Sequence, residues 1–479
     1  MAEYTTTIGL EIHAELKTAS KMWCGCKNDP EEKKPNTNVC PVCMAHPGTL
    51  PVANKGAIKE VIRVGLALGS KIADFTEFDR KNYFYPDIPK GYQLSQYKLP
   101  IVLGGSLNGV AITRVHLEED TAKSTHDKGD TTLVDFNRSG VPLMELVTEP
   151  VVKSAKEAGD FARELQRLLR YLGAGEANME KGQMRVEANI SVSKEPGKYG
   201  TKVEVKNINS FRSVERAIEY EVERQIGVLE NGGKIVQETR GWDENKQETW
   251  SQRKKESSHD YRYFPDPDLP KFYLSEIPEF NLEKLKKELP ELPWQKRERY
   301  VKDFELKPEF VEFFLNDPAA ADYFESVIKG KDKTFILLAA NYLVSDISGL
   351  LKKAGREFSV EVLPDPTYFR ELVTMIEKNL LSSRSGKDIL SILVEDTLSQ
   401  KPLKNPQIIA EEKGLLQKTD EGALKQIVEK VISANASVAA EYKSGKENAL
   451  QFLIGQCMKE AKGSGNPGIF MKLLKENLS

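Results

Sequence analysis

The amino-acid sequence predicts an α+β protein in which a sheet-containing N-terminal region precedes two helical regions. Before residue 290, apolar and polar residues alternate along several short segments, as in strands with one buried and one open face. Beyond it, apolar residues recur at helical spacing. Proline-containing breaks at 290–293 and 401–406 separate these regions. The predicted domains are therefore residues 1–293, 294–404 and 405–479.

The predicted strands share an open face that is rich in carboxylates. In residues 8–16, Ile8, Leu10 and Ile12 lie on one face, while Glu11 and His13 lie on the other. Residues 184–193 and 202–207 alternate in the same way. This pattern is typical of an antiparallel sheet with one face on a core. Helical spacing predicts two helices within this region, at 156–172 and 211–229.

Helices are predicted throughout the C-terminal part. The segments are 319–329, 334–353, 368–381, a stretch around 424–432, 446–462 and 468–478. In the stretch 424–432 the apolar residues follow the spacing i, i+3, i+4, i+7 and i+8, which indicates an amphipathic helix.

Composition narrows the function only broadly. The chain has 479 residues and a formal net charge of −3, so any nucleic-acid contact must come from local basic patches. No run of 18 apolar residues is present, and the N-terminus has neither a basic nor an apolar leader. We expect a cytoplasmic protein without a membrane segment.

Several enzyme classes are disfavoured by missing motifs. The sequence contains no P-loop, no kinase glycine-rich loop and no G-x-S-x-G elbow. The chain therefore does not resemble a P-loop NTPase, a protein kinase or a serine hydrolase.

Four of the five cysteines form two close pairs near the N-terminus, Cys24 with Cys26 and Cys40 with Cys43. Four thiolates suit a tetrahedral Zn²⁺, and four protein ligands leave no open position, so we predict a structural zinc site at residues 24–43. A redox pair or free core cysteines are the alternatives. The fifth cysteine, Cys457, lies on an apolar helical stripe and is predicted to be a core residue.

Carboxylates that converge on one sheet face would repel one another, and Mg²⁺, which prefers oxygen ligands, would relieve that repulsion. The candidates are Glu11 with His13, the pair Glu118 and Glu119, and the segments around Glu145 and Glu187. A solvated sheet face without a ligand is the alternative.

Residues 79–96 combine cations, aromatic residues and turn formers, and Pro86, Pro89 and Gly91 predict a loop. Arg80, Lys81 or Lys90 could hold phosphate there, and Tyr83 or Tyr85 could stack on a base. A packed loop without a ligand is the alternative. Residues 260–268 are similar, with Arg262 as the cation.

Motifs along the whole chain resemble one known family, the GatB subunits of the aspartyl/glutamyl-tRNA amidotransferase (GatCAB). These motifs are I-G-L-E-I-H at 8–13, R-K-N-Y-F-Y-P-D at 80–87, H-L-E-E-D at 116–120, N-R-S-G-V-P-L at 137–143, K-N-I-N-S-F at 206–211 and D-Y-R-Y-F-P-D at 260–266. The segments 452–456 and 465–467 resemble the helical tail of YqeY-like proteins.

The resemblance implies a cradle domain similar to glutamine synthetase, then a helical domain and a YqeY-like tail that contacts tRNA. The implied activity is ATP-dependent transamidation of misacylated Glu-tRNA(Gln) or Asp-tRNA(Asn). The chain would phosphorylate the side-chain carboxylate, and ammonia from the amidase partner, GatA, would displace the phosphate. The small partner, GatC, would complete the complex, and a glutamyl- or aspartyl-tRNA synthetase is another candidate partner.

The resemblance also implies roles for particular residues. The family's catalytic magnesium ligands correspond to Glu11, His13, Glu119 and Glu145, with Glu187 as a further member at a position where the family more often has Asp. Alternation alone does not choose between Glu118 and Glu119, because a β-bulge would exchange their faces. The ammonia path or phosphate contacts would involve the four residues Lys81, Tyr83, Arg80 and Lys206.

Two other functions fit the same residues. The first is a non-catalytic tRNA-binding scaffold, in which the acidic face is structural. The second is a ligase that amidates a free small acid, although such an enzyme has little need for the long helical C-terminal third.

Overall fold

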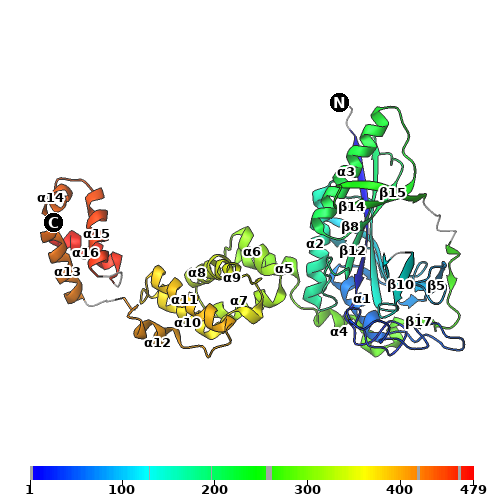
Figure 1. The fold of residues 1–479 in the computed structure, drawn as a ribbon, viewed down its shortest axis with the longest axis horizontal. Coiled ribbons are helices and arrows are strands. Elements are labelled where there is room, and N and C mark those ends of the chain that lie inside the picture. The colour runs from blue at the N-terminus through cyan, green and yellow to red at the C-terminus, as the bar shows by residue number, and fades with distance from the viewer. Residues whose placement is uncertain are drawn as a thin grey trace. The chain divides into compact units, whose positions relative to one another are not determined.

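The computed structural model describes residues 4–128, 130–195, 197–254, 261–417, 421–461 and 465–478. The chain divides into two compact units, Met1–Gln295 and Lys296–Ser479 (Figure 1). The first unit contains the described strands and the second is helical, so the predicted α+β class is confirmed. The boundary lies close to the predicted break at 290–293.

The first unit is built on a ten-stranded sheet. Its strands follow the order β15-β14-β13-β12-β1-β11-β8-β6-β2, with β7 paired to β8. Neighbours are antiparallel except for β13 and β14. The strands are β1 (Thr5–Glu15), β2 (Lys71–Ile72), β6 (Val102–Leu103), β7 (Ser106–Leu107), β8 (Val110–Glu119), β11 (Pro142–Thr148), β12 (Met184–Ser193), β13 (Val203–Ile208), β14 (Glu238–Asp243) and β15 (Glu248–Lys254).

Helices cover one face of this sheet. They are α1 (Lys55–Ala67), α2 (Ala155–Leu172) and α3 (Phe211–Glu230), which contact β8, β1 and β12 respectively (Figure 1). The apolar side chains of β1, such as Ile8, Leu10 and Ile12, are fully buried in this core. The N-cap Ser154 of α2 accepts a hydrogen bond from Glu157, and Gly173 ends the helix in the left-handed conformation. The opposite face of the sheet is therefore free to carry polar residues.

A three-stranded sheet lies beside β8. It pairs β4 (Asp79–Asn82) with β5 (Tyr92–Ser95) and β16 (Phe264–Pro265). The segment 79–96, predicted to be a loop, is thus a loop only between its two ends, where Arg80 pairs with Leu94 and Lys81 with Gln93. The smaller sheets pair β3 (Phe75–Thr76) with β17 (Phe272–Tyr273), and β9 (Lys123–Lys128) with β10 (Thr131–Asp135).

The remaining elements after residue 273 are helical. They are the 3-10 turns Leu274–Glu276 and Pro278–Phe280, α4 (Leu282–Lys287), α5 (Pro293–Lys302), α6 (Pro308–Leu315), α7 (Pro318–Ile328), α8 (Lys333–Asn341), a π-helical segment Tyr342–Ile347, α9 (Ser348–Lys353), the 3-10 turn Val360–Val362, α10 (Pro366–Glu377), α11 (Ser383–Leu398), α12 (Pro406–Glu412), α13 (Glu421–Ala434), α14 (Ala436–Lys443), α15 (Asn448–Glu460) and α16 (Pro467–Leu478).

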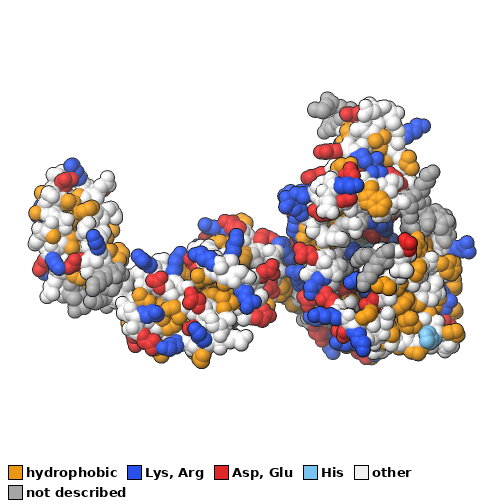
Figure 2. Space-filling view, viewed as in Figure 1, with side chains coloured by type: hydrophobic (Ala, Val, Ile, Leu, Met, Phe, Trp, Pro, Cys, Tyr) orange, Lys and Arg blue, Asp and Glu red, His pale blue; other side chains and the backbone are white. Residues whose placement is uncertain are grey.

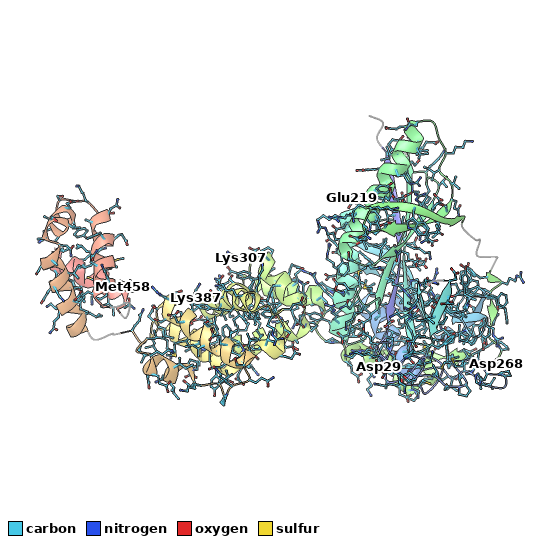
Figure 3. All side chains as sticks on the ribbon, in the orientation of Figure 1. Asp29, Glu219, Asp268, Lys307, Lys387 and Met458 are labelled. Atoms are coloured by element: carbon cyan, nitrogen blue, oxygen red, sulfur yellow. The ribbon has the colours of Figure 1, made fainter. Side chains whose placement is uncertain are left out.

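The tail helices have an apolar cluster of their own. Leu424 of α13, Leu453 of α15 and Phe470 of α16 are completely buried in it. Cys457 lies in the same cluster, as the sequence predicts. On the face seen in Figure 2, lysine and arginine side chains of the second unit are interspersed with acidic ones. Lys387 on α11 is labelled in Figure 3, and its Nζ lies 2.7 Å from Oδ1 of Asp346 in the π-helical segment.

One continuous helical run, Lys333–Lys353, passes a test of length and hydropathy for a membrane span. Core helices of soluble proteins pass the same test, and Phe335, Ala339, Leu343 and Ile347 of this run are fully buried in the second unit. These four side chains of the run therefore contribute to the core of the second unit.

Candidate active site and metal centres

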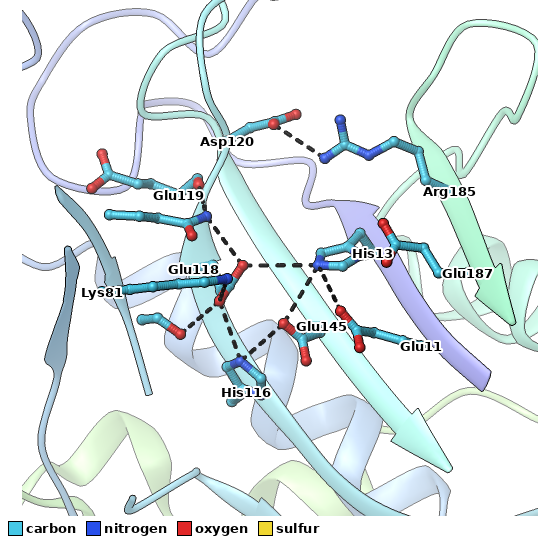
Figure 4. A network of polar contacts seen from close by, with 12 residues as sticks. Glu11, His13, Lys81, His116, Glu118, Glu119, Asp120, Glu145, Arg185 and Glu187 are labelled. Carbon is cyan, nitrogen blue, oxygen red and sulfur yellow. Dashed lines mark hydrogen bonds and ion pairs between the residues drawn. The ribbon is translucent and has the colours of Figure 1, made fainter. Parts of the chain in front are cut away.

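Three neighbouring strands bring acidic and imidazole side chains together on the open face of the large sheet. β1 lies between β11 and β12, and His13 stands opposite Glu145 on β11. Glu145 in turn stands opposite His116 on β8. Glu11, two residues before His13, projects to the same face. Figure 4 shows these side chains pointing toward one another from separate strands.

The distances define an acidic cluster of Glu11, His13, His116, Glu118 and Glu145. His13 Nε2 lies 3.4 Å from Glu145 Oε2, 3.9 Å from Glu118 Oε2 and 4.0 Å from Glu11 Oε1. His116 Nε2 lies 3.4 Å from Glu145 Oε2 and 3.5 Å from Glu118 Oε1. The sequence did not single out His116, although its spacing of two from Glu118 was the available signal.

Charge compensation within the cluster shifts several pKa values. Burial raises the pKa of Glu145, but the imidazoles of His116 and His13 outweigh it and hold that pKa well below its usual range. Burial lowers the pKa of His116, yet Glu145 and Glu118 raise it to about 9. The pKa of His13 is raised in the same sense, because Glu145 outweighs burial. Protonated imidazoles therefore neutralise the carboxylates.

The pKa of Glu11 is shifted in the opposite direction to that of Glu145. Burial, followed by the negative charges of Glu145 and Glu187, raises its pKa to about 7. This carboxyl is thus held partly protonated near neutral pH, which a nearby cation would reverse.

The donor set fits a divalent cation. Potential ligand atoms lie within 4.8 Å of one another in three overlapping groups: Glu11, His13 and Glu145; His116, Glu118 and Glu145; and Glu11, Glu187 and Glu204. Carboxylate oxygens are the ligands that Mg²⁺ prefers. Among the described residues, the buried Nδ1 atoms of His13 and His116 have no hydrogen-bond partner, so each ring has an uncommitted nitrogen.

Glu118 belongs to the acidic cluster, whereas Glu119, the position implied by the resemblance, has other hydrogen-bond partners. Ser95 Oγ donates to Glu118 Oε1 at 2.6 Å, and Gln93 Nε2 donates to Glu118 Oε2 at 3.1 Å. Glu119 instead accepts from Lys90 Nζ at 2.6 Å and from the Leu94 amide at 3.0 Å.

Glu118 lies in the acidic cluster because β8 pairs regularly with β11 at this point. The pairing of β8 with β11 runs without a bulge from Arg114 to Glu119, so Glu118 shares the face of His116. Both side chains accept hydrogen bonds from β5, but only Glu118 lies beside His116.

Glu187 and Lys206 form an ion pair at the edge of the cluster. Lys206 Nζ lies 2.6 Å from Glu187 Oε2 and 3.9 Å from Glu204 Oε1. Burial lowers the pKa of Lys206, but Glu187 and Glu204 raise it above its usual value. Glu187 therefore already has a cationic partner.

The remaining predicted site residues lie on or beside β4, and they differ in how far they reach toward the cluster. Lys81 Nζ lies 4.0 Å from Glu118 Oε1, so this lysine reaches the acidic cluster (Figure 4). Arg80 pairs with two aspartates: its Nε lies 2.5 Å from Asp266 Oδ2, and its Nη2 lies 2.8 Å from Asp268 Oδ2. Tyr83 lies beside Lys81, and burial raises the pKa of its hydroxyl. Asp260, part of one predicted motif, lies outside the described residues.

A second cluster contains the four predicted zinc ligands, Cys24, Cys26, Cys40 and Cys43. Their sulfur atoms lie within 4.8 Å of one another, and a tetrahedral Zn²⁺ with Zn–S bonds of about 2.3 Å requires comparable spacing. The Cys40 amide donates to Cys43 Sγ at 3.1 Å. A hydrogen bond from Cys24, opposed by burial, lowers the pKa of Cys43 to about 5. One thiolate is thus available at neutral pH, and the four residues fit zinc.

Comparison with known proteins identifies the class. Residues 6–277, which include the acidic and cysteine clusters, match the family model described as the GatB/GatE catalytic domain. Residues 322–478 match the model described as the GatB domain. The first of these matches covers more than half of the chain.

The chain therefore belongs to the GatB/GatE family. A protein of Crocosphaera subtropica is 44% identical over 499 aligned positions, covering 100% of this chain and 98% of the relative. A protein of Caldanaerobacter subterraneus subsp. tengcongensis is also 44% identical, with 100% of both chains covered. Thermomicrobium roseum has a relative that is 43% identical over 99% of both chains. All three relatives are named as the B subunit of aspartyl/glutamyl-tRNA(Asn/Gln) amidotransferase.

Proposed function

We propose that this chain is the carboxyl-activating subunit of an ATP-dependent tRNA amidotransferase. Its substrates are misacylated Glu-tRNA(Gln), Asp-tRNA(Asn) or both. The observation that carries the proposal is the acidic cluster, which lies within the segment that matches a catalytic-domain model. Relatives that align over the full chain bear the name of the corresponding amidotransferase component.

The chemistry requires activation because a carboxylate does not react with ammonia at a useful rate. In the first step, an oxygen of the substrate carboxylate attacks the γ-phosphorus of ATP, and ADP leaves. In the second step, ammonia attacks the acyl carbon, phosphate leaves with the bridging oxygen, and the nitrogen loses a proton. The product is Gln-tRNA or Asn-tRNA.

Glu11, Glu118, Glu145 and His13 are the proposed magnesium ligands, with Glu187 beside them. When bound there, Mg²⁺ neutralises phosphate oxygens and favours in-line transfer. Ser95 and Gln93 orient Glu118 through both of its oxygens. Lys81, 4.0 Å from Glu118, supplies a fixed positive charge toward the transferred phosphate.

Further roles are proton acceptance and the guidance of ammonia to the acyl carbon. His13 can act either as a ligand or as the acceptor of the proton that the nitrogen loses once a bound cation has offset the charge of Glu145, which raises the pKa of His13 in the absence of a cation. Lys81 and Tyr83 are proposed to line the path by which ammonia arrives, as the family resemblance implies. Zinc on the four cysteines would be structural, because those ligands leave no open position.

The proposed partners follow from the same assignment. The amidase GatA would supply ammonia from glutamine, and the small protein GatC would complete the complex. The helical tail, 405–479, would contact tRNA, and a glutamyl- or aspartyl-tRNA synthetase is a further candidate partner. The proposed compartment is the cytoplasm.

Isotope transfer tests the activation step directly. The chain, purified with GatA and GatC, is given ATP, Mg²⁺, ammonium and Glu-tRNA labelled with ¹⁸O in the side-chain carboxylate. The proposal requires one ¹⁸O atom in the released phosphate for each amide formed. Amide formation without label in phosphate would overturn the acyl-phosphate route, and tRNA binding without ATP consumption would favour the scaffold function.

A further inference from the structure

An aromatic pocket lies beside the acidic cluster, and apart from Tyr83 its lining residues have no part in the proposed reaction. Its volume is about 660 Å³, and it is lined by Asn82, Tyr83, Phe84, Tyr85, Tyr261, Arg262 and Phe264. Several of its rings face solvent: the exposed fraction is 88% for Phe84, 54% for Tyr85 and 44% for Phe264. Three exposed aromatic side chains around one hollow indicate a binding surface rather than a core.

The pocket has a fixed geometry. The ring centroids of Tyr83 and Tyr85 are 5.9 Å apart with planes at 64°, and those of Tyr83 and Tyr261 are 5.9 Å apart at 69°. Asn82 Nδ2 donates to the carbonyls of Tyr261 at 3.1 Å and of Arg262 at 2.9 Å. These bonds tie the two lining segments together and hold Arg262 at φ 46°, a conformation that costs energy for a non-glycine residue.

One side chain connects the pocket to the carboxylates. Lys81 Nζ lies 5.3 Å from the centroid of the Tyr261 ring and 4.0 Å from Glu118 Oε1. The Lys81 ammonium group is therefore close both to the Tyr261 ring, at the edge of the pocket, and to Glu118, at the proposed site of phosphoryl transfer.

This separation matches the end of an aminoacyl-tRNA. In a glutamyl ester, five bonds join the side-chain carboxyl carbon to the ribose oxygen, an extended length of about 6 Å. The nucleobase on that ribose lies further along in the same direction. A carboxylate near Glu118 thus allows the terminal base to reach the Tyr261 ring, which Lys81 links to the cluster.

We propose that the aromatic pocket receives the base of the 3′-terminal adenosine of the aminoacyl-tRNA. The inference rests on the proposed function and adds a substrate subsite to it. Unpaired tRNA ends offer bases that stack on aromatic side chains, and Arg262, an exposed cation on the rim, suits the adjoining phosphodiester. The base of ATP is the competing occupant, because five bonds likewise join the γ-phosphorus of ATP to its ribose oxygen, and the two occupants are distinguished by which KM the pocket variants raise.

Steady-state kinetics of the complete complex test this subsite. Ammonium is the nitrogen donor, so glutamine hydrolysis by the partner does not enter the rate. Tyr85→Ala should raise KM for Glu-tRNA by about tenfold, while Tyr85→Phe, which keeps the ring, should stay within about twofold. KM for ATP should not change. Tyr273→Ala is the matched control, because Tyr273 is 49% exposed, lies on β17 and does not line the pocket.

A truncated ligand identifies the occupant. Uncharged tRNA with and without its 3′-terminal adenosine is used as an inhibitor of the wild-type and Tyr85→Ala complexes. The wild type should bind the complete tRNA more tightly than the truncated one, and Tyr85→Ala should lose that preference.

Each contrary outcome overturns the inference in a distinct way. A rise in KM for ATP alone would assign the pocket to the nucleotide. Unchanged KM values and an unchanged adenosine preference would exclude a base from the pocket. If the ammonium-dependent rate of Tyr85→Ala were unchanged and the rate fell only in a parallel assay with glutamine, the pocket would be part of a contact with GatA or GatC. The failure of the wild-type complex to form any amide would instead be a failure of the proposed function.

Discussion

The acidic cluster and the cysteine cluster both gather candidate metal ligands, but the chain holds them in place by different means. The acidic ligands project from β1, β8 and β11, three hydrogen-bonded neighbours in the middle of the sheet. The four cysteines lie on the connection between β1 and α1, where the described residues 16–54 form no helix or extended strand.

Because the two clusters are held differently, the metal at the acidic cluster should serve activity and the metal at the cysteine cluster should serve the stability of the fold. Strand register fixes the acidic ligands whether or not a cation is bound, and protonated histidines compensate the carboxylates in its place. The cysteine loops have no comparable ladder, so a metal would have to hold them together. Loss of the first metal should therefore cost activity, and loss of the second should cost stability. Four predictions test this contrast.

The largest effect is expected at Glu118. Glu118→Gln keeps the shape of the side chain but removes a ligand charge, so ATP-dependent amide formation should fall by about 10²- to 10³-fold. The melting temperature should change little. The rate is measured on the complex by analysis of the amino acid released from tRNA. Glu279→Gln, an exposed carboxylate paired with Lys55, is the control. Full activity in Glu118→Gln would remove this residue from the site.

A different signature is expected at the cysteine cluster. Cys40→Ser should abolish bound zinc and lower the melting temperature by about 5 °C or more, because the loops lose their cross-link. The amide-forming rate per folded molecule should persist at low temperature. Elemental analysis and calorimetry give the two readouts. Cys457→Ala, in the tail core, should leave zinc content unchanged. Zinc retained in Cys40→Ser would contradict the assignment.

The pH dependence of magnesium binding tests Glu11. Its pKa is raised to about 7, so the group must lose a proton before it can bind a cation below that pH. Magnesium affinity should therefore weaken by about tenfold from pH 8 to pH 6, with protons released on binding. Titration calorimetry in buffers of different ionisation enthalpy measures both quantities. Glu11→Gln should reduce the dependence to the part that comes from His13, which also loses a proton when it binds a cation, and a flat profile in the wild type would refute the interpretation.

The smallest effect is expected from Ser95, which contacts Glu118 but not the proposed cation. Ser95→Ala removes one of the hydrogen bonds that orient Glu118 and leaves the one from Gln93. Magnesium affinity should fall by about three- to tenfold. Ser106→Ala, an exposed serine on β7, is the comparison variant. Equal affinities in the two variants would show that Glu118 needs no such support.

Much of this contrast could be predicted from the sequence because both clusters have local signals. The two cysteine pairs are recognisable by their spacing. Alternation places Glu11 and His13 on one strand face, and β1 has that face open. The helices predicted at 156–172 and 211–229 correspond to α2 and α3 with ends within one residue.

What escaped prediction depends on long-range pairing. The register that sets Glu145 opposite His13 and His116 is a property of three strands together. The choice between Glu118 and Glu119 required knowing that β8 continues without a bulge to its end. The contact of Lys90 with Glu119 likewise depends on how β5 packs on β8. No single segment contains that information.

The measurement that tests the central claim most directly is amide formation on tRNA by the chain purified with GatA and GatC. Glu-tRNA(Gln) or Asp-tRNA(Asn) is supplied with ATP, Mg²⁺ and ammonium, and the amino acid released from the tRNA is analysed. We expect glutamine or asparagine to form only when ATP is present, and its formation to be lost in Glu118→Gln but not in Glu279→Gln. Absence of amide on both tRNAs, with tRNA still bound, would contradict it and leave a scaffold function instead.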